Sequence, residues 1–417
     1  MKILFLTDNF PPEVNAPANR TYEHCREWVQ KGVKVTIITC APNFPQGKVY
    51  KGYKNKFYQT EVIDEIKVIR VWSYIAANEG FLKRTFDFMS FGIMSFFIGL
   101  FIKTDLIIAT SPQFFTPIAG RCLAFFKRKP WIMEVRDLWP ESIKAVGAMS
   151  ANSLSYKFLE ALELAMYKSA RQIIVVTDAF KKYIKERKIS ESKIIVIKNG
   201  VDLTKISSTK NKNVKLVKQL NLEGKFVVGY IGTHGMAHKL DFVLNSASSD
   251  KLDKDICFLF IGDGAEKKRL LALQSKLKLE NVIMCDPVPK SEVYEYISIL
   301  DVALVNLKKS DTFKTVIPSK IFENSAMKKP ILLGVEGESK GIIEKYRAGV
   351  CFEPENEADF IQKLQLLKQD QILYQQCVLG CENLVKDFDR VALARKMLDA
   401  INIYTEEYFS QSDIKSI

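Results

Sequence analysis

The residues with the clearest chemical potential lie in the segment YIGTHGMAHKLDFVL, at residues 230–244. Glycine-rich turns that lead into a helix bind diphosphates through backbone N–H groups, and a lysine adds a positive charge. The candidate contacts of this segment are Gly232, Thr233, His234, Gly235, His238 and Lys239. Two histidines four residues apart could also suggest a metal. No acidic residue or cysteine stands at ligand spacing, so we expect no metal site and no cofactor.

A second candidate segment is VIPSKIFENSAMKKPIL, at residues 316–332. Pro318 and Ser319 begin a predicted helix whose first N–H groups could hold a phosphate, and Lys320 follows them. Glu323 lies one turn further on the same face. Because a carboxylate repels phosphate, Glu323 is better suited to neutral hydroxyls such as a ribose diol; the alternative is an ordinary surface glutamate.

Three further loops follow apolar runs. FIGDGAEKKRL offers Gly262 and Asp263, either as ligand contacts or as a simple tight turn. DNFPPEVNAPANR leads into a helix whose free N–H groups could meet an anion, unless it is only a rigid turn. Its candidate contacts are Asn15, Ala16, Asn19 and Arg20, with Arg20 as the foremost anion contact. In MEVRDLWPES, Arg136 and Asp137 directly follow a buried strand, and Asp137 could face a ligand or cap a helix.

The elements that must position these loops alternate between short β-branched apolar runs and helical segments. Such runs are typical of strands buried on both faces of a parallel sheet. The first series is predicted at residues 2–7, 34–39, 105–110, 131–135, 172–176 and 193–197. After a polar join at residues 199–213, the second is predicted at 225–232, 255–262, 280–285, 301–305, 329–334 and 348–352.

This pattern predicts an α/β protein of two doubly wound, parallel-sheet, Rossmann-like domains that face one another across a cleft. The expected domains are residues 1–200, with a helix at about 390–417 packing back on them, and residues 201–389. Open parallel sheets bind ligands beyond the carboxyl ends of their strands, where all the loops above lie.

Charge is distributed unevenly. The net charge is +13; residues 1–198 carry 30 Lys+Arg against 18 Asp+Glu, whereas residues 199–417 carry 31 against 30. We therefore expect the first half to meet an anionic partner. The basic residues are not interleaved with aromatic ones in a recognised motif, so we expect no nucleic acid.

An anionic membrane surface is the remaining partner. The apolar segment 80–103 is flanked by Lys83, Arg84 and Lys103, and residues 127–129 add basic charge. This segment could equally be a core helix. We expect one face to pack in the protein and the other to reach the bilayer. The scattered cysteines are typical of reduced core thiols and a cytoplasmic location.

In its motifs the chain resembles GT-B glycosyltransferases of glycosyltransferase family 4 along essentially its whole length. The motifs are the PPE loop, RDLWPES, NGVD, GDG and PSKIFE. The exact residues of these motifs are similar to those of N-acetyl-fucosamine-type transferases of bacterial O-antigen and capsule clusters. The resemblance implies metal-independent, retaining transfer of an N-acetylated deoxyhexose from a UDP-linked donor. The implied acceptor is a polyprenyl-diphosphate-linked saccharide at the inner face of the cytoplasmic membrane.

The resemblance also implies roles for particular residues. Glu323 matches the glutamate that binds the nucleotide ribose, Lys239 matches a diphosphate-binding lysine, and Asp137 is the candidate acid/base or acceptor-positioning residue. Thr233 and Thr315 stand where the family commonly has an arginine and a second glutamate. Alternatives on the same fold are a sugar-nucleotide 2-epimerase and a catalytically degenerate membrane-associated scaffold.

Overall fold

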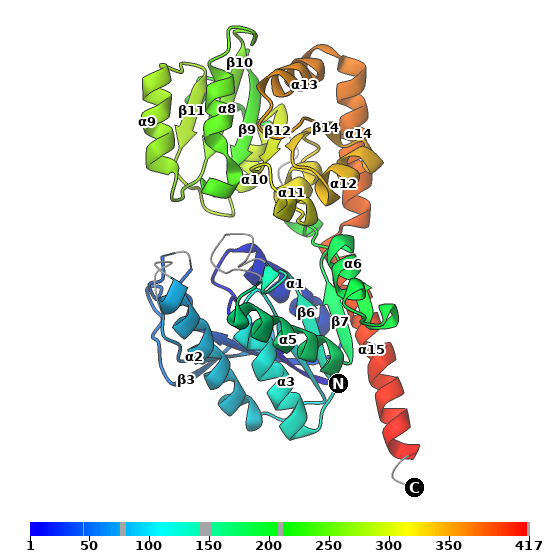
Figure 1. The fold of residues 1–417 in the computed structure, drawn as a ribbon. Helices are drawn as coiled ribbons and strands as arrows, with labels where there is room; N and C mark the ends of the chain where they lie inside the picture. Colours follow the sequence, from blue (N-terminus) through cyan, green and yellow to red (C-terminus); the bar gives the residue numbers. More distant parts are fainter. Residues whose placement is uncertain (45, 76–80, 142–151, 207–211, 415–417) are drawn as a thin grey trace. The chain divides into compact units, whose positions relative to one another are not determined.

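The computed structural model describes residues 1–44, 46–75, 81–141, 152–206 and 212–414. The chain divides into two compact units (Figure 1). Unit 1 comprises Met1–Lys198 together with Arg390–Ile417, and unit 2 comprises Asn199–Asp389.

Unit 1 is built on an eight-stranded sheet in the order β3-β4-β2-β1-β5-β6-β7-β8. The strands are β1 (Lys2–Leu6), β2 (Lys34–Cys40), β3 (Tyr58–Ile63), β4 (Ile66–Val71), β5 (Leu106–Thr110), β6 (Trp131–Val135), β7 (Gln172–Val175) and β8 (Ile194–Val196). All the strands predicted for this unit are confirmed and pair in parallel. The antiparallel hairpin of β3 and β4 was not predicted, because β3 alternates between exposed and half-buried residues and has no continuous apolar run.

Helices cover both faces of this sheet. One face carries α1 (Ala16–Gln30) and α15 (Arg390–Ile414); the other carries α2 (Phe81–Leu100), α3 (Phe115–Lys127), α5 (Leu154–Ser169) and α6 (Asp178–Glu186). Both faces need cover because the apolar side chains of β1 alternate between them: Ile3 and Phe5 enter one core, and Leu4 and Leu6 enter the other. The Trp28 indole N–H donates to Ala394 O at 2.8 Å, so α15 packs on α1 after the chain has passed through unit 2.

Helix α2 packs closely against α3 on one side. A Cβ added at Gly99 would lie 2.6 Å from Leu123 Cδ1, and one at Gly92 would lie 3.0 Å from Phe115. Phe91 and Met94 are buried in the unit 1 core, whereas Phe97 and Phe101 on the outer side are exposed. None of the helices in the described ranges has the length and apolar character that crossing a bilayer requires.

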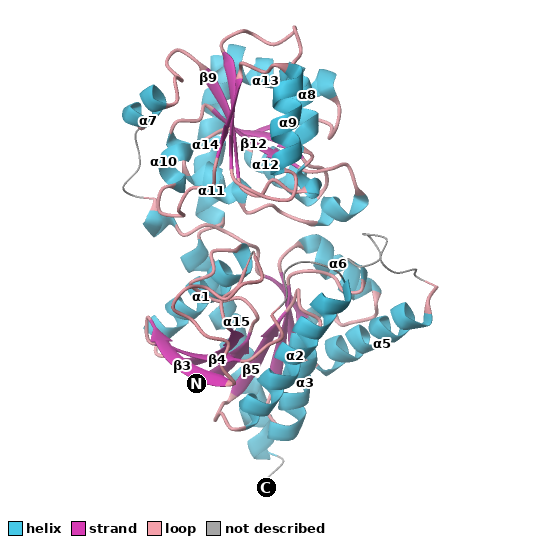
Figure 2. Ribbon diagram, turned by 90° about the vertical axis from the view of Figure 1, so that its left-hand side faces the viewer, coloured by secondary structure: helices cyan, strands magenta, loops and turns pink. Residues whose placement is uncertain are grey.

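Unit 2 contains a fully parallel six-stranded sheet in the order β11-β10-β9-β12-β13-β14. Its strands are β9 (Phe226–Ile231), β10 (Ile256–Ile261), β11 (Val282–Cys285), β12 (Val302–Asn306), β13 (Ile331–Gly334) and β14 (Gly349–Cys351). Each of these strands was predicted. Figure 2 shows helices on either side of the sheet.

The helices of unit 2 form two layers. One contains α8 (Leu240–Ala247), α9 (Lys267–Leu277) and α13 (Glu357–Gln369); the other contains α10 (Val293–Ser298), α11 (Lys320–Ala326), α12 (Glu338–Tyr346) and α14 (Gln371–Asp387). Helix α7 (Val214–Gln219) precedes β9. Short 3₁₀ turns lie at Glu191–Lys193, Leu203–Lys205, Met236–His238 and Asp311–Thr315.

Each sheet has one point where its strand order reverses. In unit 1 the chain runs from β1 to β2 on one side, and β5 lies on the other side of β1. In unit 2 the corresponding point lies between β9 and β12. Loops beyond the carboxyl ends of strands diverge at such a switch point and leave a crevice for ligands. The loops that matter most therefore follow β1 and β5 in unit 1, and β9 and β12 in unit 2.

Candidate active site

The carboxyl ends of β9 and β10 meet through two glycines. Gly232 and Gly262 have φ angles of +143° and +145°, which suit glycine. Gly232 N donates to Ile261 O at 2.8 Å, and a Cβ on Gly262 would lie 1.9 Å from Gly232 O. Asp263 O accepts a hydrogen bond from His234 N, also at 2.8 Å. The two predicted glycine loops are therefore joined by backbone contact.

Lys320, from the start of α11, lies directly against the first of these glycines. A Cβ on Gly232 would be 2.4 Å from Lys320 Cε and 2.7 Å from Nζ. The ammonium lies 5.1 Å from the centre of the Tyr230 ring, and no residue in the described ranges accepts a hydrogen bond from it. Burial lowers the Lys320 pKa, which the charge of Glu323 partly offsets. A desolvated ammonium without an acceptor is suited to an anionic ligand.

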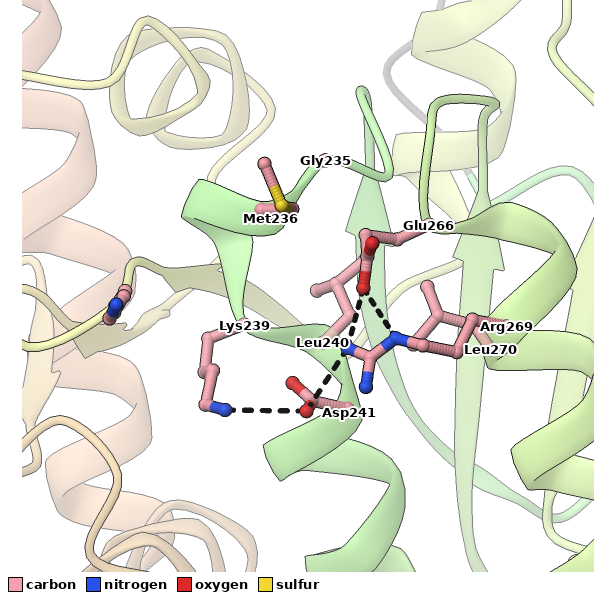
Figure 3. A pocket seen from close by; sticks show the side chains of 9 residues that line it. Gly235, Met236, Lys239, Leu240, Asp241, Glu266, Arg269 and Leu270 are labelled. Atoms are coloured by element: carbon pink, nitrogen blue, oxygen red, sulfur yellow. Dashed lines mark hydrogen bonds and ion pairs between the residues drawn. The ribbon is translucent and has the colours of Figure 1, made fainter. Parts of the chain in front are cut away.

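Lys239 lies beside a separate cavity of about 300 Å³ at the starts of α8 and α9 (Figure 3). Its ammonium is 3.3 Å from Asp241 Oδ2, which also pairs with Arg269 at 3.2 Å. Arg269 in turn bonds Glu266 at 2.5 Å. Lys239 is therefore part of a charge network on the protein, and an anion that binds it must compete with Asp241.

The two histidines of the predicted glycine loop are neutral at physiological pH. Burial and nearby lysines lower the pKa of His234 and of His238 to about 4. The His234 ring is fully buried, and neither nitrogen has a partner among described residues. The place of His234 among the predicted nucleotide contacts stays a prediction; its backbone N–H is already bonded to Asp263 O. In the described part of the chain, no three His, Cys, Asp or Glu residues converge on a possible metal position.

Ser319 and Glu323 flank Lys320 as the sequence predicted. Ser319 immediately precedes α11 and its carbonyl accepts from Glu323 N at 3.3 Å. Glu323 is half-buried, one turn after Lys320 on the same helix. The carboxylate and the ammonium are thus close enough to interact electrostatically. This places a hydrogen-bond acceptor next to a cationic position, which fits a ligand with both hydroxyls and phosphates.

The unit 1 loop that follows β1 ends in a capped helix. Asn15 is the N-cap of α1 and its Oδ1 accepts from Ala18 N at 2.8 Å. Asn15 Nδ2 also donates to Asn9 Oδ1, and Asn19 Nδ2 donates to Val14 O at 3.3 Å. Ala16 contributes its carbonyl, which accepts from the Arg136 guanidinium at 3.4 Å. These polar side chains therefore shape the loop itself.

Arg20 does not present a free charge to an anion, which corrects the prediction. The residue is 1% exposed, and its Nε donates to Glu134 Oε1 at 2.9 Å. The remaining nitrogens donate to the carbonyls of Ile197 and Lys198, both at 2.9 Å. Glu134 is 114 residues away in sequence, so this pairing depends on the fold. Arg20 ties α1 to β6 and to the end of β8.

Arg136 and Asp137 lie at the carboxyl end of β6. The Arg136 guanidinium donates to Thr21 Oγ1 at 3.3 Å, and burial lowers its pKa to about 10. Asp137 Oδ1 accepts from Leu138 N at 3.0 Å, and the backbone N–H of Asp137 donates to Ser111 Oγ at 3.2 Å. The Asp137 carboxylate therefore bonds the backbone of the next residue, whereas a helix N-cap accepts from an N–H two or three residues on.

Comparison with known families agrees with this arrangement of two parallel-sheet units. A family model described as Glycosyltransferase Family 4 matches residues 18–205. A model described as Glycosyl transferases group 1 matches residues 212–379. The chain therefore carries two glycosyltransferase domains.

Individual relatives are similar along much or all of the chain. WcaI of Escherichia coli (strain K12), named for glycosyl transfer in colanic acid biosynthesis, is 24% identical over 93% of this chain and 98% of its own length. TuaH of Bacillus subtilis (strain 168), named for teichuronic acid biosynthesis, is 28% identical over 55% of this chain and 56% of its own length.

Solved structures confirm the GT-B fold. Sucrose-phosphate synthase from Thermosynechococcus elongatus gives a TM-score of 0.76 at 14% identity, covering 98% of this chain and 99% of its own. Anabaena HepE, solved with UDP and glucose, gives a TM-score of 0.69 at 15% identity, covering 96% of this chain and 99% of its own.

Several residues of the second glycosyltransferase domain were not predicted. Tyr230 donates its hydroxyl to Thr233 O at 2.8 Å and places its ring beneath Lys320. Asn306, at the end of β12, donates to His238 O at 3.0 Å and to Lys239 O at 3.4 Å. Both hold the loop after β9. A polar residue at the end of a buried strand, as in VALVN, was the available signal for Asn306.

Proposed function

We propose that the protein is a retaining glycosyltransferase of bacterial surface-polysaccharide biosynthesis. It transfers an N-acetylated deoxyhexose from a UDP-linked donor to a polyprenyl-diphosphate-linked saccharide, without a metal. The names of WcaI and TuaH support a role in polysaccharide biosynthesis. Anabaena HepE, a structural neighbour, was solved with UDP-glucose, which supports a UDP-linked donor.

The Lys320 ammonium is the observation that carries this proposal. It lies against Gly232 at the switch point of unit 2, with no acceptor among described residues. A nucleoside diphosphate would supply the missing negative charge, while Glu323 one turn away would accept hydrogen bonds from the ribose hydroxyls. The leaving diphosphate gains charge as the sugar departs, so a fixed ammonium stabilises the transition state more than the ground state.

In the proposed reaction, the acceptor hydroxyl forms the new bond to the anomeric carbon on the face from which UDP departs. The oxygen linking the sugar to the diphosphate takes the bonding electrons, and the hydroxyl proton passes to the departing phosphate. The protein contributes position and charge rather than a nucleophile. Lys320 supplies a cation at the donor end, and Lys239 supplies a second one when the diphosphate displaces Asp241 from it.

Nucleotide binding and transfer test this proposal in two steps. We expect UDP to raise the unfolding midpoint of the protein more than ADP, GDP or CMP does. Labelled UDP-sugars should then transfer label to lipid-linked saccharides extracted from membranes of the native host, and EDTA should leave the rate unchanged. Loss of activity that only a divalent metal restores would contradict metal independence. Conversion of the donor without acceptor would favour a 2-epimerase instead.

A membrane partner is part of the proposal, because a lipid-linked acceptor is confined to the bilayer. The outer side of α2 presents Phe86, Ile93 and Phe97, and Phe101 follows its last residue; the four side chains are between 49% and 85% exposed. They recur at helical spacing along one stripe. Exposed Lys83, Arg84 and Lys103 lie at the two ends of the helix. An apolar stripe with basic ends is typical of a helix that lies in a bilayer interface.

Lys127 does not belong to this basic surface, contrary to the expectation for residues 127–129. Its ammonium donates to Leu100 O at 2.8 Å, and burial lowers its pKa. It therefore caps the end of α2, whereas Arg128 remains exposed.

Vesicle binding tests the membrane partner without sugar chemistry. We expect the protein to sediment with phosphatidylglycerol vesicles at low salt and to be released by salt, since each basic residue near an anionic surface contributes roughly 1 kcal/mol. The double variant Phe97→Ser, Phe101→Ser should bind these vesicles less. Phe57→Ser is the matched control, because Phe57 is a 66% exposed aromatic outside this stripe. Equal binding by all three proteins would contradict the assignment of α2.

A further inference from the structure

Asp8 occupies the switch point of unit 1. It follows β1 by two residues, on the side where β2 and β5 diverge from that strand. The Asp8 carbonyl accepts hydrogen bonds from Thr39 Oγ1 and Cys40 Sγ, both at 3.1 Å, and these fix its backbone. The backbone is thus anchored by the neighbouring strand, while the side chain takes no part in those bonds.

The Asp8 carboxylate is left incompletely paired. Its Oδ1 is buried and has no hydrogen-bond partner among the described residues. Burial raises the Asp8 pKa, while Asn9, Arg136 and Arg84 act in the opposite direction. A buried carboxylate oxygen without a donor is unfavourable for folding. Such groups occur at strained or catalytic sites and where a water, an ion or a ligand supplies the missing partner.

The other carboxylates near this loop have their partners within the protein. Glu13 Oε1 accepts from Asn43 N at 2.8 Å and from Phe44 N at 2.9 Å. Glu134 Oε1 pairs with Arg20, while its Oε2 is buried without a hydrogen bond among the described residues and lies 3.9 Å from the Arg136 guanidinium. Asp137 Oδ1 accepts from Leu138 N. These side chains hold loops and strands together. Asp8 Oδ1, by contrast, makes no hydrogen bond to another element of the described fold.

We propose that Asp8 binds the acceptor, with its carboxylate accepting a hydrogen bond from a hydroxyl of the acceptor saccharide. This inference rests on the proposed function and names a residue of its acceptor site. A neutral hydroxyl fits better than an ion. An anion would be repelled by the carboxylate, whereas Arg136 and Arg84 already supply positive charge. A hydroxyl donates the missing hydrogen bond without adding charge.

Asp8→Asn tests the assignment, because an amide keeps the shape and loses the charge. With labelled UDP-sugars and host lipid-linked saccharides, we expect kcat/KM for the acceptor to fall about 10- to 150-fold, the loss of one charge-assisted hydrogen bond. The Kd for UDP should stay unchanged. Asp105→Asn is the matched control, since Asp105 bonds Lys2 N at the opposite edge of the same sheet. It should leave acceptor kinetics unchanged.

Two outcomes separate this inference from the function on which it rests. Absence of transfer by the wild-type protein would overturn the proposed function and, with it, the acceptor role. Transfer by the wild type that continues undiminished in Asp8→Asn would overturn only the role of Asp8. An equal loss of UDP affinity would also overturn it, because the residue would then act on the whole site.

Stability provides a readout that a structural role would not give. We expect Asp8→Asn to raise the unfolding midpoint at neutral pH, because it removes a buried charge that lacks a full set of partners. The pKa of Asp8 is raised in the folded state. The stability gained by Asp8→Asn is therefore largest above that pKa and disappears as the pH falls to about 4, the ordinary carboxyl range. The groups that face Asp8 are Asn9, Arg136, Arg84, Glu13 and Cys40. A lower midpoint would mean that Asp8 stabilises the fold, and would overturn the inference.

Discussion

The two switch points differ in the sign of the charged side chain that we propose binds a ligand. In unit 2 it is a cation, the Lys320 ammonium, which lies against Gly232 without an acceptor among described residues. In unit 1 it is the Asp8 Oδ1 atom, which is buried without a donor in the described structure. The nearby arginine of unit 1, Arg20, is by contrast fully engaged with Glu134 and two carbonyls. Arg20 has its partners inside the protein and stabilises the fold. Lys320 and Asp8 Oδ1 lack such partners within the described ranges, and we propose that they bind ligands.

This contrast matches the chemistry of two substrates. A nucleotide donor is anionic at its diphosphate and needs cations that the protein has not neutralised. A saccharide acceptor is neutral at the hydroxyl that reacts, and needs a hydrogen-bond acceptor instead. Variants of paired and unpaired charges should consequently separate stability from activity.

The largest effect is expected from Arg20→Met, on stability. Removing this guanidinium leaves the Glu134 carboxylate buried without its closest partner, which destabilises proteins by about 3–5 kcal/mol. Urea denaturation monitored by circular dichroism measures the change. UDP affinity should remain normal in the folded fraction. A stable variant with weakened ligand binding would restore Arg20 to the site.

Lys320→Met should have the next largest effect, on donor binding. We expect the Kd for UDP to rise about 10- to 150-fold, because a buried charge-assisted contact is lost. Isothermal titration calorimetry measures it. Lys329→Met is the control, since Lys329 is bonded to Ser298 O and Leu300 O, each at 2.7 Å. That variant should lose stability and keep its UDP affinity when folded; equal affinities in all three proteins would remove Lys320 from the site.

Glu323→Gln should weaken UDP binding about tenfold, because an amide oxygen is a poorer acceptor for ribose hydroxyls. The measurement is a comparison of UDP with 2′-deoxy-UDP. The variant should discriminate less between them than the wild type does. Unchanged discrimination would mean that Glu323 does not contact the ribose.

The smallest effect concerns Glu13, the satisfied carboxylate near Asp8. Burial raises its pKa to about 7, so the wild type is stabilised less as the pH rises from about 4.5 to about 7. The difference in free energy of unfolding, Glu13→Gln minus wild type, should therefore increase by about 1–2 kcal/mol between pH 5 and pH 8. Thermal unfolding in a pH series gives the difference. A constant difference would show that Glu13 does not titrate in this range.

The sequence correctly predicted the strands that are buried on both faces of a sheet. Strands such as KILFL and ICFLFI are covered on both faces, so they appear as continuous apolar runs. The β3–β4 hairpin was missed because β3 is an edge strand with alternating exposure, and Lys67 and Arg70 interrupt the apolar run of β4. Arg20 was misassigned because its partner, Glu134, is distant in sequence and only the fold brings the two together. Asp8 and Asp137 both follow buried strands, and only their hydrogen bonds distinguish them.

The return of α15 to unit 1 has a consequence for biosynthesis. Leu393, Met397 and Ile401 complete the apolar layer that covers Trp28 and Cys25. A ribosome makes Trp28 long before it makes those residues. At roughly 5–20 residues per second, translating unit 2 alone takes about 10–40 s. During that interval the face of α1 that α15 will cover stays open, so unit 2 can finish folding before unit 1 does. Nascent chains stalled before residue 390 should therefore recruit chaperones through the surface around Trp28.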